Sequence, residues 1–293
     1  INVGEVDILV GLPTHNNAKT VGDVVHTIRS GLLRGFPRER AVIINADGGS
    51  RDGTPEMVTG VAIDDVRPAS NLNALRTLHS ISTQYANGTG GGAGLRTILA
   101  AAELLRAKAC VMMSPESAKI EPEWIPNLLR PIYHDGFDLV APTYRRHKFD
   151  GLLMTNLLYP MVRALYGVRL REVYMPEFGF SNRLGRQFLG QNGWNDGAGS
   201  GAGLRFTLAA IKGGYRICQA FLGEKDHIER HAADLVPALR QTVGSLFSAL
   251  ESDFSMWSVV TGSKPITTIG SDQEFLLDPM RVNRKRLRDM FRT

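Results

Sequence analysis

Residues 7–17 read DILVGLPTHNN and residues 41–54 read AVIINADGGSRDGT, and these two stretches decide the fold. Each begins with an apolar run, which predicts a buried strand, and each ends in a polar loop. A helical pattern from about residue 21 to residue 33 separates them. The order predicts a β-α-β unit with both loops at the carboxyl ends of parallel strands, where open α/β sheets bind ligands.

Further strands and helices continue this α/β pattern and predict a mixed, mostly parallel sheet flanked by helices. Strands are predicted at residues 109–113, 138–142 and 216–222, with a short extended segment at 177–181. Helices are predicted at residues 95–106, from 122, at 152–166 with an interruption at Pro160, near 183–189 and at 235–250.

The composition is that of an ordinary globular protein. The 293 residues are 43% apolar and 22% charged, which is enough to build one large α/β domain. Gly, Ser, Thr and Pro dominate residues 261–272. We therefore expect one domain over residues 1–252, followed over 253–293 by a linker and a basic helix from Val282, in a chain that continues beyond Thr293.

The sequence also predicts where the protein is found. It contains no run of 18 apolar residues and no basic-then-apolar leader pattern, so we expect a cytoplasmic protein without a membrane span. Cys110 and Cys218 lie in apolar, strand-like runs. They are expected to be reduced core thiols and not a disulfide or a metal pair.

The formal net charge is +5, but the excess is local. One basic cluster is Arg145-Arg146-His147-Lys148, and a second occupies the last dozen residues. Neither lies beside an aromatic stacking platform or a recognition-helix signature, so no nucleic-acid partner is expected. The first cluster is better suited to a small anion, such as a phosphate-bearing metabolite.

Four short stretches, in their order along the chain, carry a resemblance to a known family. They are residues 144–151 (YRRHKFDG), 155–160 (TNLLYP), 177–181 (EFGFS) and 220–227 (AFLGEKDH). With the opening β-α-β unit, they make residues 6–250 resemble a GT-A fold glycosyltransferase. Within that fold the chain is similar to the retaining enzymes that make glucosylglycerate, glucosyl-3-phosphoglycerate and their mannosyl counterparts.

This resemblance implies a fold and an activity. It implies a Rossmann-like GT-A glycosyltransferase domain over residues 1–252, the start of a helical C-terminal extension within residues 253–293, and a homodimer. It implies transfer of glucose or mannose from a nucleotide diphospho-sugar to glycerate or 3-phosphoglycerate, with retained configuration, in a synthesis of the compatible-solute type. A divalent cation, Mg²⁺ or Mn²⁺, is the implied cofactor.

The resemblance also assigns roles to individual residues. Lys225 is implied to lie near the diphosphate, and Glu177 to hold the sugar hydroxyls. The metal ligands implied are Glu116 and His227. The implied nucleotide-binding residues are Pro13, Thr14, Asn17, Asp47, Gly48 and Pro115, and the implied acceptor-binding residues are Lys148, Thr155, Asn156 and Glu229.

Four of these roles have alternatives in ordinary structural chemistry. Glu177 can be a loop glutamate in an ion pair, and His227 can be an ordinary surface or core histidine. The Asp47 carboxylate can accept from a base N–H or a ribose hydroxyl, but an aspartate before two glycines also forms turns. Glu116 can offer an oxygen to a divalent cation, which needs one or two carboxylates besides diphosphate oxygens. It can equally be an acid at the entry to a helix.

The sequence departs from the family pattern in three loops. Ser114 stands where the family has the first carboxylate of an Asp-x-Asp motif, Gly91 where it has a lysine, and Gly203 where it has an aspartate. A non-catalytic sugar-nucleotide binding protein is therefore an alternative. A nucleotidyltransferase is a second, although residues 13–17 lack the glycine-rich, basic loop of that class.

Overall fold

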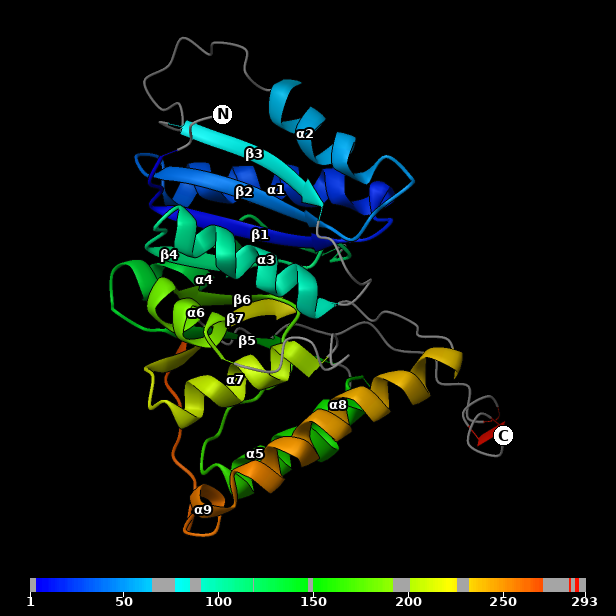
Figure 1. Cartoon of the computed structure of the whole chain (residues 1–293), viewed down its shortest axis with the longest axis vertical. Coiled ribbons are helices and arrows are strands. Elements are labelled where there is room, and N and C mark those ends of the chain that lie inside the picture. Colours follow the sequence, from blue (N-terminus) through cyan, green and yellow to red (C-terminus); the bar gives the residue numbers. More distant parts are fainter. Residues whose placement is uncertain are drawn as a thin grey trace.

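The computed structural model describes residues 4–64, 77–84, 91–117, 119–146, 150–191, 201–225 and 232–270, together with residues 285, 288 and 289. One sheet runs through this part of the chain, in the strand order β3-β2-β1-β4-β6-β5-β7-β8 (Figure 1). Every neighbouring pair is parallel except the two pairs that β6 makes with β4 and β5. The mixed, mostly parallel sheet predicted from the sequence is confirmed.

The bounds of the elements are as follows. The strands are β1 (Ile8–Thr14), β2 (Arg40–Asp47), β3 (Thr77–Gln84), β4 (Ala109–Met112), β5 (Leu139–Arg145), β6 (Phe178–Ser181), β7 (Ile217–Glu224) and β8 (Thr268–Ile269). The helices are α1 (Ala18–Gly35), α2 (Thr54–Asp64), α3 (Gly91–Leu104), α4 (Trp124–Tyr133), the π-helix η1 (Met154–Leu158), α5 (Tyr159–Leu165), α6 (Asn182–Leu189), α7 (Ala202–Lys212), α8 (Ala232–Ser252) and α9 (Phe254–Trp257).

The sheet has an apolar core on each face. Along β1, Ile8 and Val10 belong to the core formed with α1 and α4, whereas Leu9 belongs to the core formed with α3, α6 and α7. Figure 1 shows α3, α6 and α7 in front of the sheet and α1 and α4 behind it. This alternation follows from the two-residue period of a strand, and it explains why strands buried on both faces read as continuous apolar runs.

Helix α4 packs closely against β6 at a glycine. A Cβ atom at Gly179 would lie 2.2 Å from the carbonyl oxygen of Leu128, so no larger residue fits without moving the helix. Because β6 is short and central, this contact fixes the height of α4 over the sheet. The loop between β4 and α4 is thereby held in place.

Parallel strands bring their carboxyl ends to one edge of the sheet. β1, β2, β4, β5 and β7 all end there, and antiparallel β6 begins there. The loops after β1 and β2, together with residues 114–117, 177 and 225, therefore meet at this carboxyl edge. Ligands of open α/β sheets bind at such an edge.

Two elements differ from the sequence-based expectation. β3 was not predicted; it pairs with β2 at one border of the sheet, and its sequence TLHSISTQ is mostly polar. An interruption at Pro160 was expected in a helix over residues 152–166, and the structure gives it the form of a π-helical turn. Residues 152–165 form one continuous helical run, in which η1 directly precedes α5 and Pro160 is the second residue of α5.

The chain after residue 252 returns to the sheet. β8 pairs with β7, and Val168 forms a bridge with Lys264. Asp253 accepts from the hydroxyl of Tyr166 at 2.8 Å and from Lys212 Nζ at 2.5 Å. Residues 253–270 are therefore attached to the preceding domain, while a helical region beyond them stays a prediction.

Both cysteines are free and fully buried, in β4 and β7. Burial raises the pKa of the Cys110 thiol, and it raises that of Cys218 to about 12. The expectation of core thiols is confirmed. In the described part of the chain no helix is both long and apolar enough to cross a membrane.

Candidate active site

Two loops at the carboxyl edge are tied together by hydrogen bonds. We call residues 13–17 and 47–54 the nucleotide platform. Gly48 N donates to Thr14 O at 2.7 Å, and Asn16 N donates to Ser50 Oγ at 2.8 Å. Asn17 N donates to Thr54 Oγ1 at 2.8 Å. The structure thus brings together the nucleotide-binding residues predicted from both loops.

Asp47 lies inside this platform and is 1% exposed. Its Oδ1 is 3.1 Å from Thr14 Oγ1 and accepts from Ser50 Oγ at 2.5 Å. Its Oδ2 accepts from the backbone N–H groups of Gly49 and Ser50 at 3.0 and 2.9 Å. The single hydroxyl proton of Thr14 has a shorter contact with Asn45 Oδ1, at 2.7 Å, so the donors to Asp47 are the three groups of its own loop. Asp47 therefore has the contacts of a turn-forming aspartate, the alternative left open by the sequence.

The loop after β4 is fastened to the platform. Thr20 Oγ1 donates to Pro115 O at 2.7 Å, and Asn17 Nδ2 donates to Glu116 Oε1 at 3.4 Å. The Asn17 Oδ1 atom accepts from His15 N at 2.7 Å, so one buried amide joins both loops. Ser114, at the first carboxylate position of the family motif, accepts from Glu116 N at 3.3 Å and shapes the turn.

Among the described residues, one predicted metal ligand, Glu116, is present at the carboxyl edge. Among them no group of three His, Cys, Asp or Glu side chains could hold a metal ion. Glu116 is exposed at the carboxyl edge and supplies one carboxylate. Mg²⁺ bound at a diphosphate needs only one or two carboxylates and takes its other ligands from phosphate and water. His227, the second predicted ligand, lies outside the described residues.

The two predicted catalytic residues meet in a buried cluster, which we call the Glu177 cluster (Ser117, Tyr144, Glu177 and Lys225). Lys225 Nζ lies 3.1 and 2.8 Å from the two carboxylate oxygens of Glu177. The Tyr144 hydroxyl donates to Glu177 Oε2 at 2.7 Å, and Ser117 Oγ donates to Oε1. Glu177 is 0% exposed. Its acceptor positions are filled by these side chains, which is the geometry of a group that orients Lys225.

The predicted acceptor residues Thr155 and Asn156 are exposed and lie on η1. π-Helical turns are rare and occur frequently at functional sites. Thr155 Oγ1 donates to Gly151 O at 3.2 Å. Lys148 and Glu229, the other predicted acceptor residues, lie outside the described part of the chain.

Arg146, which the sequence suggested as part of an anion pocket, is bound to two carboxylates. It donates to Glu172 through Nε at 2.9 Å and Nη2 at 2.8 Å, and to Asp150 at 3.1 Å. Burial alone would lower the pKa of Arg146, but the pair with Glu172 outweighs it and the pKa is raised. Arg146 thus joins the end of β5 to the chain before and after η1.

Tyr144 and Ser117 were given no role by the sequence. Tyr144 is one residue from the end of β5, and Ser117 follows the turn after β4. A polar residue at the carboxyl end of a strand is the signal that identified Asp47, and it would have identified Tyr144. Gly203, where the family has an aspartate, lies in the first turn of α7, and a Cβ there would lie 3.7 Å from Met175 O.

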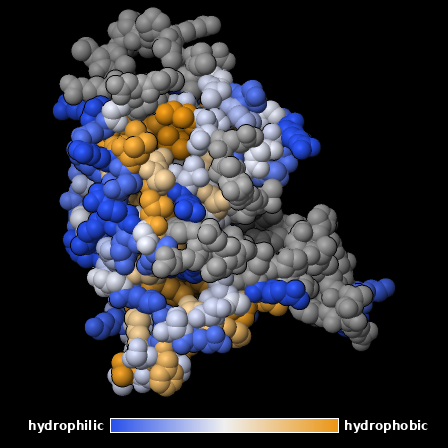
Figure 2. Space-filling view, in the orientation of Figure 1, coloured by the Kyte–Doolittle hydropathy of each residue, from blue (hydrophilic) through white to orange (hydrophobic). Residues whose placement is uncertain are grey.

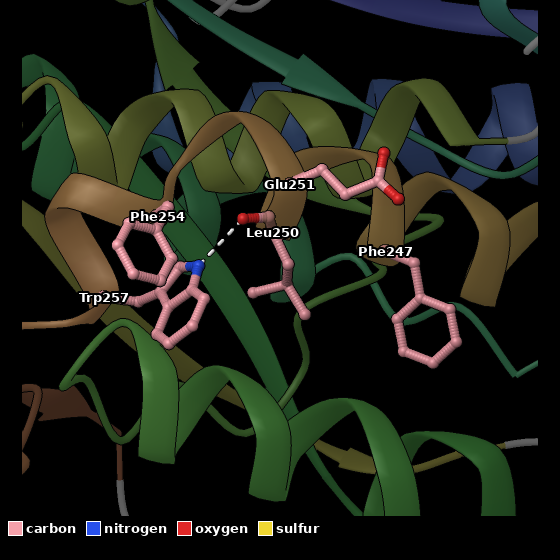
Figure 3. Close-up of a pocket in the computed structure, with 5 residues that line it drawn as sticks. All are labelled: Phe247, Leu250, Glu251, Phe254 and Trp257. Atoms are coloured by element: carbon pink, nitrogen blue, oxygen red, sulfur yellow. Dashed lines mark hydrogen bonds between the residues drawn. The ribbon is translucent and has the colours of Figure 1, made fainter.

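An apolar hollow of about 430 Å³ lies outside this site (Figure 3). It is formed by α8 and α9, where the indole N–H of Trp257 donates to Leu250 O at 2.8 Å and the Phe254 and Trp257 rings meet edge to face. Phe247 and Phe254 are exposed, and apolar side chains gather at this lower end of the molecule (Figure 2). None of the predicted site residues that the structure describes lines it.

Comparison with known proteins identifies relatives by structure. No family profile matches the sequence, and no curated protein matches it. The structure is similar to glucosyl-3-phosphoglycerate synthase from Mycobacterium tuberculosis in complex with Mn²⁺, UDP and glucosyl-3-phosphoglycerate. The TM-score is 0.60 at 21% identity, over 84% of this chain and 80% of that one.

Two further complexes of the same enzyme give a similar result. The complex with Mn²⁺, UDP-glucose and phosphoglyceric acid matches with a TM-score of 0.60 at 20% identity, over 84% of this chain and 80% of that chain. The complex with Mn²⁺, UDP-glucose and glycerol 3-phosphate matches with a TM-score of 0.57 at 22% identity, over 83% and 79%. The chain therefore has the GT-A fold of the glucosyl-3-phosphoglycerate synthase structures, which confirms the fold class and the resemblance predicted from the sequence.

Proposed function

We propose that this protein is a glycosyltransferase that moves a hexose, glucose or mannose, from a nucleotide diphospho-sugar to glycerate or 3-phosphoglycerate. The observation that carries the proposal is the shared fold over 84% of the chain with an enzyme bound to UDP-glucose and phosphoglyceric acid. It is supported by the position of Glu116, Glu177 and Lys225 at the carboxyl edge, where a sugar nucleotide would bind. A homodimer and a cytoplasmic location belong to the same proposal.

The donor nucleotide is proposed to lie on the nucleotide platform. Pro13, Thr14, Asn17 and Gly48 form its floor, and Pro115 closes one side. Because the Asp47 carboxylate accepts from donors of its own loop, its proposed role is to shape this floor. A preformed loop binds its ligand more tightly because the cost of ordering it is already met.

The diphosphate is proposed to lie beside Glu116 and Lys225. The Lys225 ammonium would stabilise the negative charge that builds on the leaving diphosphate. Since both Glu177 oxygens are occupied, the role proposed for Glu177 is to orient Lys225, in place of the contact with sugar hydroxyls expected from the sequence. A divalent cation held by Glu116 and His227 would supply further charge neutralisation at the diphosphate.

The acceptor is proposed to bind at η1. Thr155 and Asn156 present exposed hydroxyl and amide groups there, and Lys148 and Glu229 complete the predicted acceptor set. The Arg146 guanidinium is bound to Glu172 and Asp150, so Lys148 is the proposed partner for the carboxylate or phosphate of the acceptor. The acceptor hydroxyl would attack from the face that the diphosphate leaves, which retains the configuration; no nucleophile of the protein is assigned.

A donor and acceptor panel tests this function. UDP-, GDP- and ADP-linked glucose and mannose are incubated with glycerate or 3-phosphoglycerate and Mn²⁺, and the products are identified by NMR. The expected product is an α-linked hexosyl glycerate or phosphoglycerate from one donor. A Lys225→Met variant should make it about 100-fold more slowly, since one electrostatic group at a leaving oxygen contributes that much. Release of free sugar or absence of any product would contradict the proposal.

A non-catalytic sugar-nucleotide binding protein is the second candidate. It is favoured by Ser114, which leaves Glu116 as the single carboxylate of the motif after β4. Calorimetric titration separates the two, because binding of a sugar nucleotide without transfer or hydrolysis would favour this candidate.

A further inference from the structure

We propose that Tyr144 is a positioning residue that, with a bulge at Gly223, holds the Lys225 ammonium at the carboxyl edge, ready for an anionic diphosphate. The identity of the anion rests on the proposed function. The positioning is a property of the chain alone, so the two are tested separately.

Tyr144 contacts Lys225 in two ways. Lys225 Nζ lies 4.5 Å from the centroid of the Tyr144 ring, within range of a cation–π interaction. The Tyr144 hydroxyl also donates to Glu177 Oε2, which is 2.8 Å from the same ammonium. A lysine side chain is flexible along its four carbons. The ring and the carboxylate together select one of its orientations.

Tyr144 is itself held in place. Arg146 Cζ lies 5.3 Å from the centroid of its ring, and the Trp124 ring lies 5.7 Å away. Burial, and then the negative charge of Glu177, raise the pKa of the Tyr144 hydroxyl well above its usual value. The hydroxyl therefore remains a hydrogen-bond donor throughout the physiological pH range.

The backbone turns Lys225 toward this cluster through a bulge. Thr143 pairs with Phe221, and Arg145 pairs with Glu224. Between these two pairs the chain advances by three residues in β7 but by two in β5, so β7 contains one additional residue. Gly223 lies in the extra stretch with φ +86°, a conformation that favours glycine. Because side chains alternate with a period of two, the additional residue reverses the face of those that follow. Lys225 N then donates to Arg145 O at 3.1 Å.

The same chemistry recurs at another place in the fold, which supplies a matched control. Near α9, at the lower end of Figure 1, Asp253 accepts from the Tyr166 hydroxyl at 2.8 Å and from Lys212 Nζ at 2.5 Å. Burial, then Asp253, raise the pKa of Tyr166 as well. This second set lies on α5, α7 and the α8–α9 junction, and none of its members belongs to the nucleotide platform or the Glu177 cluster.

Amine labelling of the protein without ligand tests the positioning directly. Lysines are acetylated with a limiting dose of acetic anhydride, and the sites are quantified by mass spectrometry in the wild type and in Tyr144→Phe, Tyr144→Leu and Tyr166→Phe. Loss of one hydrogen bond should raise labelling of Lys225 about fivefold in Tyr144→Phe, with a larger rise in Tyr144→Leu, which also loses the ring. Tyr166→Phe should raise labelling of Lys212 and leave Lys225 unchanged. Unchanged Lys225 labelling in both Tyr144 variants would overturn the proposal.

A double-mutant cycle tests what the positioning is for. In the wild-type background Tyr144→Phe should lower kcat about tenfold and leave KM for the acceptor unchanged. In the Lys225→Met background it should have no further effect, because the two residues act as a unit. A purely structural loss would appear equally in both backgrounds and would overturn the proposal. If the wild type transfers no sugar, the proposed function fails, while the labelling result still decides the positioning.

Gly223→Ala gives an independent check of the bulge. No atom lies within 4 Å of a Cβ at Gly223, so the substitution acts through backbone strain alone. Gly214→Ala is the control, since Gly214 has φ +64°, equally open surroundings and a place before the start of β7. Both should destabilise the fold to a similar extent, but Gly223→Ala alone should raise labelling of Lys225. Equal Lys225 labelling in the two variants would count against the bulge.

Discussion

Single polar residues at the carboxyl edge make several bonds each, within and between loops. Asn17 contacts three segments through its backbone N–H and its two amide atoms. Asp47 accepts from Ser50 Oγ and from the N–H groups of Gly49 and Ser50. Because the bonds of these side chains are to the protein itself, substituting them should lower the free energy of unfolding even when no ligand is bound.

Asp47→Ala should destabilise the protein in the absence of any nucleotide. It removes the acceptor of the Gly49 and Ser50 N–H groups, and a donor left without its acceptor away from water costs about 1–3 kcal/mol. Urea denaturation measures the loss, and Asp52→Ala is the comparison, because Asp52 also accepts from backbone N–H groups but at an exposed position of the same loop. An unchanged free energy of unfolding with weakened UDP binding would instead favour a direct contact between Asp47 and the base.

Glu116→Gln should weaken binding of Mn²⁺ in the presence of UDP. The amide keeps the size of the side chain and can still bond Asn17, but it loses the charge that a divalent cation requires. Loss of such a ligand should reduce Mn²⁺ affinity by at least about tenfold, in line with the effect of removing groups around metals. Electron paramagnetic resonance titration of free Mn²⁺ measures this without turnover. Equal affinity in the two proteins would remove Glu116 from the metal site.

Asp138 predicts how stability depends on pH. Burial alone would raise its pKa, but hydrogen bonds from Arg183 and Ser181 outweigh burial and keep the pKa below its usual value. Because the pKa of Asp138 is lower in the folded protein than in the unfolded chain, its ionisation stabilises the fold at pH values above the unfolded-state pKa of about 4. That stabilisation is lost as the pH falls through the folded-state pKa. Wild type should therefore lose more unfolding free energy than Asp138→Asn between about pH 5 and pH 2. Parallel pH profiles for the two proteins would contradict this assignment.

At the scale of elements, close packing of helices on the sheet fixes the loops of the site. α4 rests on Gly179 of β6, and Gly31 of α1 lies where a Cβ would be 2.3 Å from Pro122 O. The loop from β4 to α4, which carries Glu116 and Ser117, is thus held between two close backbone contacts. Its position depends on both helices.

Gly179→Ala should destabilise the protein by about 1–3 kcal/mol or more, since overpacking against backbone cannot be relieved by a side-chain rotation. Gly60→Ala in α2 is the matched control, because no atom lies within 4 Å of a Cβ there and alanine favours helix. It should stabilise by about 0.5–1 kcal/mol. Chemical denaturation checks both, and a neutral Gly179→Ala would mean that α4 can move away from β6.

The sequence predicts most elements because strands buried on both faces read as apolar runs. It does not predict β3, whose polar residues lie at a border of the sheet. It predicts an interruption at Pro160, but not that this interruption is the π-turn of η1. The places of Asp47 and Glu177 could be predicted from strand ends and from the resemblance. The sequence offered two roles for each and could not decide between them, because donors around a carboxylate can come from distant parts of the chain, as Tyr144 and Lys225 show for Glu177.

At the scale of the whole molecule, the described side chains that we propose for the donor, among them Glu116 and Lys225, lie at one edge of the sheet. The apolar hollow of α8 and α9 lies apart from them, and among its described lining residues Glu251 alone is titratable. We therefore place the proposed transfer of a hexose from a sugar nucleotide to an anionic acceptor at the carboxyl edge.

A crystal structure of the protein grown with UDP-glucose and Mn²⁺ tests this claim most directly. The account predicts difference density with uridine against residues 13–17 and 47–51 and the diphosphate beside Glu116 and Lys225. Density for the nucleotide in the hollow of α8 and α9, or at any place away from the carboxyl edge, would contradict it.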